Sequence, residues 1–256
     1  MLPSSAPAKP AATVMLVRDA PSLEVLMVRR HHQIEFASGA LVFPGGKVDP
    51  GDADPAWEDH ALGWAEIEPA ERALRVCAVR EAFEESGMLI ARHAGDATWN
   101  IGARGAGERS ALAAGHCTFL DLVSGLGLKL DLGAMTLFAR WITPAALNKR
   151  FDTYFYLMTA PSDQLAACDG CETVDAEWIA PAEALRLQQT GERTIVYPTR
   201  LNLALLAESG SVADAIARTR ERRIVPIEPS LDKDGETLWI SIPPDVGYGV
   251  VARQSL

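Results

Sequence analysis

The chain has 256 residues, 48% of them hydrophobic and 23% charged, with a formal net charge of −10 at pH 7. This length is enough for one elaborated globular domain, and no apolar run approaches the roughly 18 residues of a membrane span. The acidic balance argues against nucleic acid or a membrane as partner, because both need a basic face. Four cysteines in so long a chain indicate a reducing compartment, and we expect a cytoplasmic protein.

The first part of the chain predicts a tail, a hairpin and a glycine turn. Residues 1–12 are rich in Pro, Ala and Ser and are expected to form a flexible tail. The apolar segments 13–19 and 23–30 flank a short connection that contains proline, which is typical of paired strands. The sequence Phe43-Pro44-Gly45-Gly46 then predicts a turn whose backbone can approach a ligand closely.

A helix is predicted to begin at Pro69 and to end before Gly87. Glu81, Glu84 and Glu85 fall within one turn of its polar face, opposite an apolar face that would pack on the core. Like charges at this spacing repel by roughly 0.2–0.5 kcal/mol per pair, so either solvent separates them or a cation lies among them. We favour a hard cation, Mg²⁺ or Mn²⁺, because an arginine, a glycine turn and a helix stop accompany the glutamates.

The remainder alternates strands with helices. A strand is expected at 88–91, a loop at 95–107 and an interrupted helical pair at 108–128. Further strands are expected at 135–142, 151–158 and 176–180, helices after Pro181 and Pro198, and a two-stranded ribbon within 221–245. This order predicts an α/β or α+β sandwich. We expect a domain over 13–210 with insertions near 53–68 and 92–130, and a C-terminal extension over 211–256 packed on it.

The segment REAFEESGM, which begins at Arg80, resembles the second half of the Nudix hydrolase signature. Gly46 and the following KVDPGD are similar to the first half, with Asp52 where the family usually has Glu. Residues 53–79 separate the halves, about twenty residues more than in the compact signature. An insertion at this point is found in the coenzyme A and acyl-CoA diphosphatases of the mammalian peroxisomal type. The similarity to that branch extends from about residue 13 to about residue 206 and includes WITP, RFDTYFYL and YPTRLNLALL.

The resemblance implies a Nudix α/β/α sandwich with a mixed sheet and hydrolysis of a diphosphate in a nucleotide-linked substrate, assisted by Mg²⁺ or Mn²⁺. It implies Glu81 and Glu85 as metal ligands, with Glu84 as a third ligand or as the base that orients water. The carbonyl of Gly46 would be a further ligand. Arg80 would fix a carboxylate through a charge-assisted hydrogen bond. A later loop would supply one more acid from a set in which we choose Glu172: Asp169, Glu172, Asp175 and Glu177.

Coenzyme A or acyl-CoA is the expected small-molecule substrate, giving 3',5'-ADP and 4'-phosphopantetheine or its acyl form. Arg30, Phe43 and Gly45 would contact it, since they fit part of a motif linked to coenzyme A. Trp64, in the insertion, would either line an acyl channel or only pack the insertion. Alternatives are another nucleotide such as a nucleotide sugar, a dinucleotide or an RNA cap, and a Nudix-fold binding module without catalysis. We expect a monomer or a homodimer.

Overall fold

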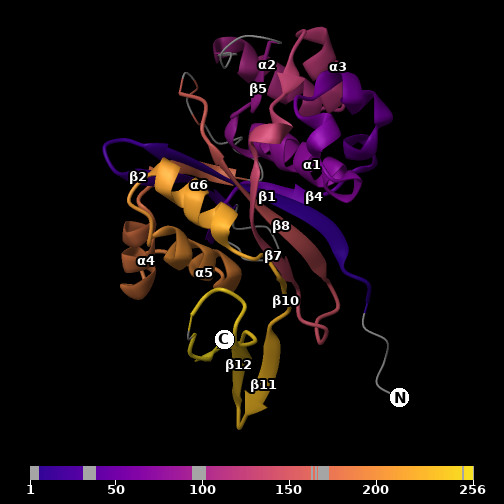
Figure 1. Cartoon of the computed structure of the whole chain (residues 1–256). Helices are drawn as coiled ribbons and strands as arrows, with labels where there is room; N and C mark the ends of the chain where they lie inside the picture. The colour runs from indigo at the N-terminus through magenta and orange to yellow at the C-terminus, as the bar shows by residue number, and fades with distance from the viewer. Residues whose placement is uncertain are drawn as a thin grey trace.

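The structure is a computed structural model that describes residues 6–30, 39–93, 102–162, 164, 166, 173–249 and 251–255. Its centre is a mixed eight-stranded sheet with the order β10-β7-β8-β1-β2-β3, in which β4 also pairs with β1 and β9 with β2 (Figure 1). Its strands are β1 (Lys9–Asp19), β2 (Leu23–Arg30), β3 (Leu41–Val42), β4 (Gly45–Lys47), β7 (Thr136–Ile142), β8 (Phe151–Thr159), β9 (Thr173–Ile179) and β10 (Pro226–Ile227).

Strand β1 is longer than the sequence predicts, because it begins at Lys9 within the expected tail. It pairs in parallel with β8 over nine residue pairs, from Lys9↔Phe151 to Val17↔Thr159. Its other edge is shared: the first half pairs with β4 and the second half with β2, both antiparallel. The segment 9–12 is therefore part of the sheet, and the prediction of a flexible tail up to residue 12 is wrong for these four residues.

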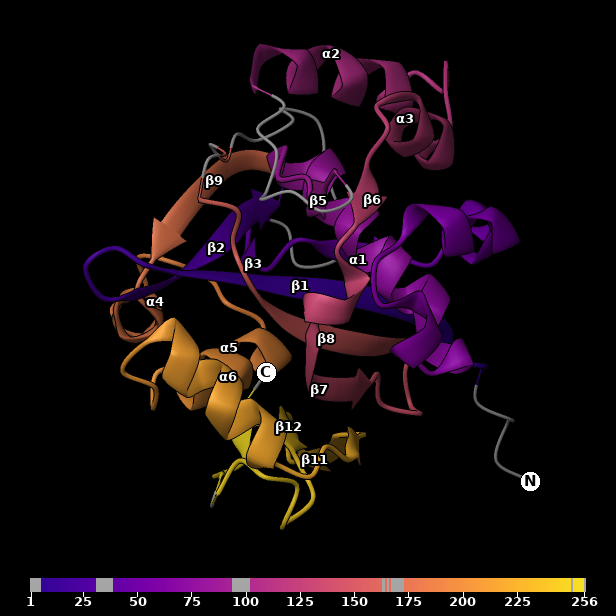
Figure 2. The ribbon, with the colours of Figure 1, turned by 45° about the horizontal axis from the view of Figure 1, so that its top comes forward.

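Helices cover both faces of the sheet, as the α/β sandwich prediction requires (Figure 2). Helix α1 (Pro69–Ser86) lies on one face, and α4 (Pro181–Gln189), α5 (Tyr197–Leu206) and α6 (Val212–Glu221) lie on the other. Alternate residues of β1 separate the two cores, since Val14 belongs to the core under α1 and Met15 to the core under the other helices. The sandwich with a mixed sheet is confirmed.

Helix α1 follows the sequence prediction at both ends. Pro69 stands in its first turn, where the missing N–H costs no hydrogen bond. Gly87 adopts φ 72° and donates its N–H to the carbonyl of Phe83 at 2.9 Å. A left-handed residue of this kind is favourable only for glycine, so it ends the helix directly after the glutamates.

Two insertions pack on α1 and on each other. The first forms the 3₁₀ helices η1 (Pro50–Ala53), η2 (Pro55–His60) and η3 (Trp64–Glu66). The second contains β5 (Ala91–Arg92), α2 (Gly102–Ala113), α3 (Phe119–Gly125), β6 (Lys129–Leu130) and η4 (Leu132–Ala134). Trp57 is 1% exposed and its ring lies 5.6 Å from that of Phe119, so this tryptophan joins the two insertions to the core.

The second insertion differs from the prediction in two places. Residues 102–107, expected in a loop, are helical despite their glycines. Arg109 of this helix donates to the carbonyl of Glu84 at 2.8 Å, and such tertiary contacts override weak local propensity. The expected strand at 88–91 is reduced to β5, because the side chain of Gln164 bonds both backbone groups of Leu89, at 2.8 and 2.7 Å, in place of a partner strand.

The C-terminal part continues the main sheet and then leaves it. Helix α6 packs on the sheet, and β10 pairs in parallel with β7. The predicted ribbon is present as β11 (Ser230–Asp234) and β12 (Thr237–Ser241), joined by β13 (Gln254–Ser255) in a separate three-stranded sheet. Among the helices that the structure describes, none is long and apolar enough to cross a bilayer.

Candidate active site

A pocket of about 520 Å³ opens where β4, the C-terminal half of α1 and the first half of β8 meet. Its wall contains most of the residues that the sequence singled out. These are Phe43, Gly45, Gly46, Arg80, Glu81, Glu84 and Glu85. The glycine turn and the glutamate helix, about forty residues apart in the chain, are brought together because β4 pairs with β1 and α1 packs across β1.

The three glutamates differ in burial and in partners. Glu85 is 4% exposed and accepts a hydrogen bond from the backbone N–H of Gly45 at 3.0 Å. The side chain of Glu81 is 12% exposed and that of Glu84 is 34% exposed, so Glu84 reaches furthest toward solvent. Gly46 lies against Glu81 so closely that a Cβ at this position would stand 2.3 Å from Oε1. Only glycine fits there with the carboxylate in its present place.

Arg80 connects several groups of the site through hydrogen bonds. Its Nε and Nη2 bond both carboxylate oxygens of Asp52 at 2.8 and 2.9 Å. Its Nη1 bonds Glu81 at 2.9 Å and Glu84 at 3.0 Å, and Nη2 also donates to the carbonyl of Lys47 at 3.0 Å. The predicted role of Arg80, to fix one carboxylate, is therefore too narrow, because it holds three carboxylates and the β4 backbone together.

Burial and charge act in opposite directions on these groups. Burial alone would lower the pKa of Arg80, but the hydrogen bond with Asp52 and the charge of Glu81 raise that pKa overall, so the guanidinium stays charged. Burial raises the pKa of Glu84, and Arg80 only partly offsets this effect. Burial also raises the pKa of the Cys77 thiol well above its usual value, and the charge of Asp52 adds to the rise.

The donor chemistry of the site fits a hard divalent cation, because carboxylate and carbonyl oxygens are the ligands such ions prefer. Within the described residues, however, no three acidic, histidine or cysteine side chains stand together as a ready metal site. The reason is visible in the hydrogen bonds: the guanidinium of Arg80 bonds both Glu81 and Glu84, and Glu85 is directed to Gly45. The assignment of Glu81 and Glu85 as metal ligands, with Glu84 as a third ligand or as the base, therefore stays a prediction.

The pocket wall also contains five residues that follow α1 in the chain and that were not predicted for the site: Lys149, Phe151, Thr153, Phe155 and Thr199. Strand alternation offered a signal for three of them, since 151, 153 and 155 share one face of β8. Tyr156, which directly follows Phe155 in the strand, points to the opposite core and is fully buried there. Nothing in the local sequence marks Lys149 or Thr199, which come from a loop and from α5.

Trp64 is not among the residues that line this pocket, and its role in substrate binding stays a prediction. The insertion rejoins α1 at its first turn, and Pro69 precedes Glu81 by twelve residues, about 18 Å along a helix axis. The ring of Trp64 instead packs beside the core, with the guanidinium of Arg72 over it at 4.8 Å. These contacts agree with the alternative prediction, in which Trp64 only packs the insertion.

Two predicted residues cannot be placed with the others. Glu172 and the side chain of Arg30 lie outside the described residues, and so does Asp169. The other two acids considered for the same loop are on β9, where Asp175 lies 3.6 Å from Arg29 and Glu177 lies 3.5 Å from Arg193. Neither of these two acids lines the pocket.

The sandwich, with its glutamate-bearing helix beside a glycine strand, has the Nudix fold. A solved NUDIX hydrolase from Alicyclobacillus acidocaldarius superposes with a TM-score of 0.69 at 29% identity, covering 82% of this chain and 96% of that one. The family model described as the NUDT19 Nudix domain matches residues 59–206, and the chain belongs to this family.

Curated relatives carry the same family name. Acyl-coenzyme A diphosphatase NUDT19 of Homo sapiens is 26% identical, over 76% of this chain and 63% of the relative. The protein of that name from Xenopus laevis is 24% identical, over 63% of this chain and 54% of the relative. The chain thus spans between half and two thirds of the length of these two relatives.

Proposed function

We propose that the chain is a metal-dependent Nudix diphosphatase that hydrolyses coenzyme A or acyl-CoA to 3',5'-ADP and 4'-phosphopantetheine or its acyl form. The observation that carries this proposal is the pocket that combines Glu81, Glu84 and Glu85 with the Gly45–Gly46 backbone. Support for the substrate comes from the family, since its human and Xenopus laevis members are named acyl-coenzyme A diphosphatases.

The three glutamates would have different roles, because their surroundings differ. Glu81 and Glu85, with the carbonyl of Gly46, would hold Mg²⁺ or Mn²⁺. The bound metal supplies neutralisation of the diphosphate oxygens and a lower pKa for the attacking water. Glu84 is the most exposed of the three and has a raised pKa, which suits the group that takes the proton from this water.

Arg80 positions these acids without reacting itself. Its bonds to Glu81 and Glu84 reduce the repulsion between them and keep both carboxylates at the pocket wall. The side chain of Arg80 is only 8% exposed and is anchored by Asp52. It is therefore already in position before the reaction, and no rearrangement of this side chain is needed during it. We therefore assign Arg80 as a positioning residue.

The rest of the pocket offers complementary groups for the substrate. Lys149, which is exposed at the pocket, supplies a cation for a phosphate group. Phe43 and Phe155, whose rings meet edge to face at 6.4 Å, form an apolar wall with Phe151 for the adenine or the pantetheine arm. Gly45 contributes backbone at the same wall.

Glu172 stays a prediction as a further acid. Its neighbour Thr173 donates to the carbonyl of Glu85 at 2.9 Å, so the chain enters β9 beside the end of α1. Thr173 also pairs with Arg30, which ends β2. The proposed cytoplasmic location and the choice between monomer and homodimer are likewise predictions from sequence.

The test is a competition among substrates. The full chain is incubated with Mg²⁺ and an equimolar mixture of coenzyme A, octanoyl-CoA, a nucleotide sugar, a dinucleotide and a capped RNA, and the products are identified by mass. We expect 3',5'-ADP and the matching phosphopantetheines first, and no product in excess chelator. Faster release of another nucleotide would replace the substrate, and absence of any cleavage with Mg²⁺ or Mn²⁺ would point to a binding module.

A further inference from the structure

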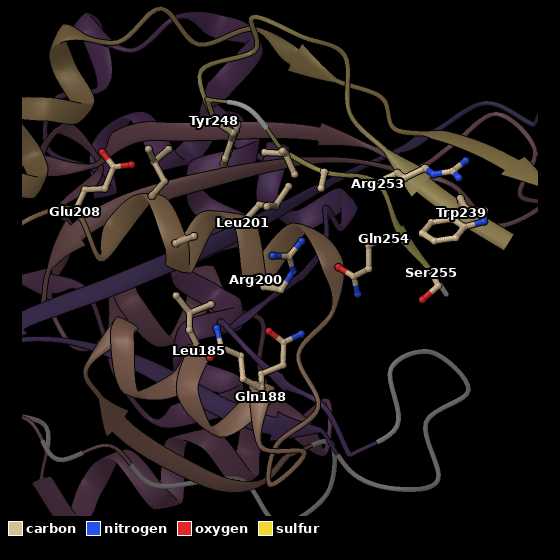
Figure 3. A pocket seen from close by; sticks show the side chains of 15 residues that line it. Leu185, Gln188, Arg200, Leu201, Glu208, Trp239, Tyr248, Arg253, Gln254 and Ser255 are labelled. Atoms are coloured by element: carbon tan, nitrogen blue, oxygen red, sulfur yellow. The ribbon is translucent and has the colours of Figure 1, made fainter. Parts of the chain in front are cut away.

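A second pocket, of about 730 Å³, lies between α4, α5 and the C-terminal sheet (Figure 3). Figure 3 shows Arg200 of α5 between Gln188 of α4 and Gln254 of β13, with Trp239 and Arg253 at one side. The Nudix chemistry described above uses none of these residues. Helix α5 separates the two pockets: Thr199 lines the catalytic pocket, whereas Arg200 and Leu201 line this one.

Arg200 brings a positive charge to this pocket without a carboxylate to balance it. In the described part of the chain no acidic side chain forms an ion pair with it, and its buried Nε has no hydrogen-bond partner. Its cationic group lies only near the ring of Tyr197, at 5.3 Å. Among the described residues of the pocket wall the one acid is Glu208, which is already paired with Arg218. A cation left in this state is stabilised by an anion.

Trp239, on the opposite wall, supplies a second unused donor. Its Nε1 is buried and has no hydrogen-bond partner among the residues that the structure describes. Arg253 lies over the same ring at 4.2 Å and is 3.4 Å from Asp234, in an ion pair whose side chains are both more than half exposed. An exposed pair of this kind is weak, so Arg253 remains available to a second anionic oxygen.

The space between these donors is partly apolar. Leu185, Leu201 and Leu205 contribute aliphatic surface from α4 and α5, and Val251 closes the pocket from the C-terminal segment. An inorganic anion would satisfy Arg200 but would leave this surface in water. A ligand with an anionic group and an apolar body would neutralise Arg200 and would also remove this apolar surface from water.

We propose that this pocket binds an amphiphilic organic anion, with its carboxylate or phosphate monoester on Arg200 and its apolar body against the leucines of α4 and α5. The Trp239 N–H donates to the same anionic group or to a polar atom beside it. The two anion chemistries share this recognition, and the experiment separates them. The inference does not rest on the proposed diphosphatase activity, because it concerns binding alone.

The test measures binding of octanoate, octyl phosphate and uncharged 1-octanol to the full chain by titration calorimetry. We expect one site for each anion and binding of 1-octanol at least tenfold weaker, since a charge-assisted hydrogen bond is lost. Arg200→Gln should weaken both anions about tenfold or more and leave 1-octanol nearly unchanged. The better of the two anions identifies the natural head group.

Matched variants locate the site. Arg223→Gln removes an exposed arginine outside the pocket and should change nothing. Trp239→Phe keeps an aromatic ring, although a smaller one, and loses the N–H, so it tests the opposite wall without changing Arg200, and it should weaken binding of the anions by a smaller factor. Unchanged affinity in both Arg200→Gln and Trp239→Phe would overturn the proposal. So would a loss of binding in Lys149→Gln, because the probes would then occupy the catalytic pocket.

Discussion

Arg80 and Asp52 form a bidentate ion pair between residues 28 positions apart, with both side chains less than a tenth exposed. The pair joins the start of the first insertion to the middle of α1. It also accounts for the aspartate in a place where the resembling signature usually has glutamate, because η1 brings the Asp52 carboxylate to the guanidinium and to the N–H of Asp49 at 2.8 Å.

This pair should be important for folding. Asp52→Ala removes the carboxylate that pairs with the buried guanidinium of Arg80. Removal of one member of a buried ion pair typically lowers the free energy of unfolding by about 3–5 kcal/mol. The free energy of unfolding from urea titration measures the effect. Asp59→Ala, at an exposed acid in the same insertion, is the control and should change stability by less than about 0.5 kcal/mol. Equal effects of the two changes would show that the pair adds nothing.

Gly46 should control the position of Glu81. In Gly46→Ala the new methyl group would meet the carboxylate at 2.3 Å, and the flexible end of Glu81 has to move. We expect hydrolysis to fall at least tenfold while the melting temperature changes little, because a side-chain end and not backbone is displaced. Gly51→Ala, where an added Cβ meets nothing within 4 Å, should keep full activity. Activity retained in both variants would contradict the close approach.

Glu81 should be needed for metal-dependent cleavage and not for folding. Glu81→Gln keeps an acceptor for Arg80 but removes a negative charge, so we expect hydrolysis to fall by two orders of magnitude or more. Addition of Mn²⁺ should raise the melting temperature of the unaltered chain and not that of the variant. Glu58→Gln, at an exposed acid of the insertion, serves as the control. Near-normal turnover of Glu81→Gln at saturating Mg²⁺ would remove Glu81 from the metal site.

Lys149 should act on substrate affinity. Loss of one charged contact to a phosphate is worth roughly 1.5–3 kcal/mol, so Lys149→Gln should raise KM for coenzyme A about tenfold or more, with a smaller change in kcat. Steady-state kinetics would measure both constants, with Lys233→Gln, in the C-terminal ribbon, as the control. If KM stays constant in Lys149→Gln, the phosphate is bound elsewhere.

Cys77 should make stability depend on alkaline pH. Its pKa in the folded chain is raised, first by burial and then by the charge of Asp52. The folded state therefore keeps the proton that the unfolded state loses, and the resulting stability is complete below about pH 8.5 and decreases as the pH rises above that value. Between about pH 8.5 and about pH 10 the unaltered chain should lose up to about 1.4 kcal/mol per pH unit more than Cys77→Ala. Urea titrations of both proteins across this range provide the measurement, and parallel slopes would contradict it.

The position of the first insertion relative to the glutamates could not be predicted from local sequence. In the sequence its ends adjoin the glycine turn and the glutamate helix, which predicts that the insertion begins and ends near the reacting diphosphate and that Trp64 can line an acyl channel. In the structure the insertion meets α1 at Pro69, about 18 Å along the helix from Glu81. Residues that adjoin a helix in sequence need not lie near its far end, because a helix of 18 residues is about 27 Å long.

Local sequence is enough to predict the extent of α1, its end at Gly87, the hairpin of β1 and β2 and the acidic face with Glu81, Glu84 and Glu85. Each depends on contacts within a few residues, through helical period, strand pattern and the left-handed freedom of glycine. Only the tertiary structure decided that Arg80 pairs with Asp52, that Lys149 and Thr199 join the pocket, and that Trp64 does not. These contacts depend on sheet pairing between distant segments and on the side of the sheet on which each insertion packs. Local sequence periodicity predicts neither of these.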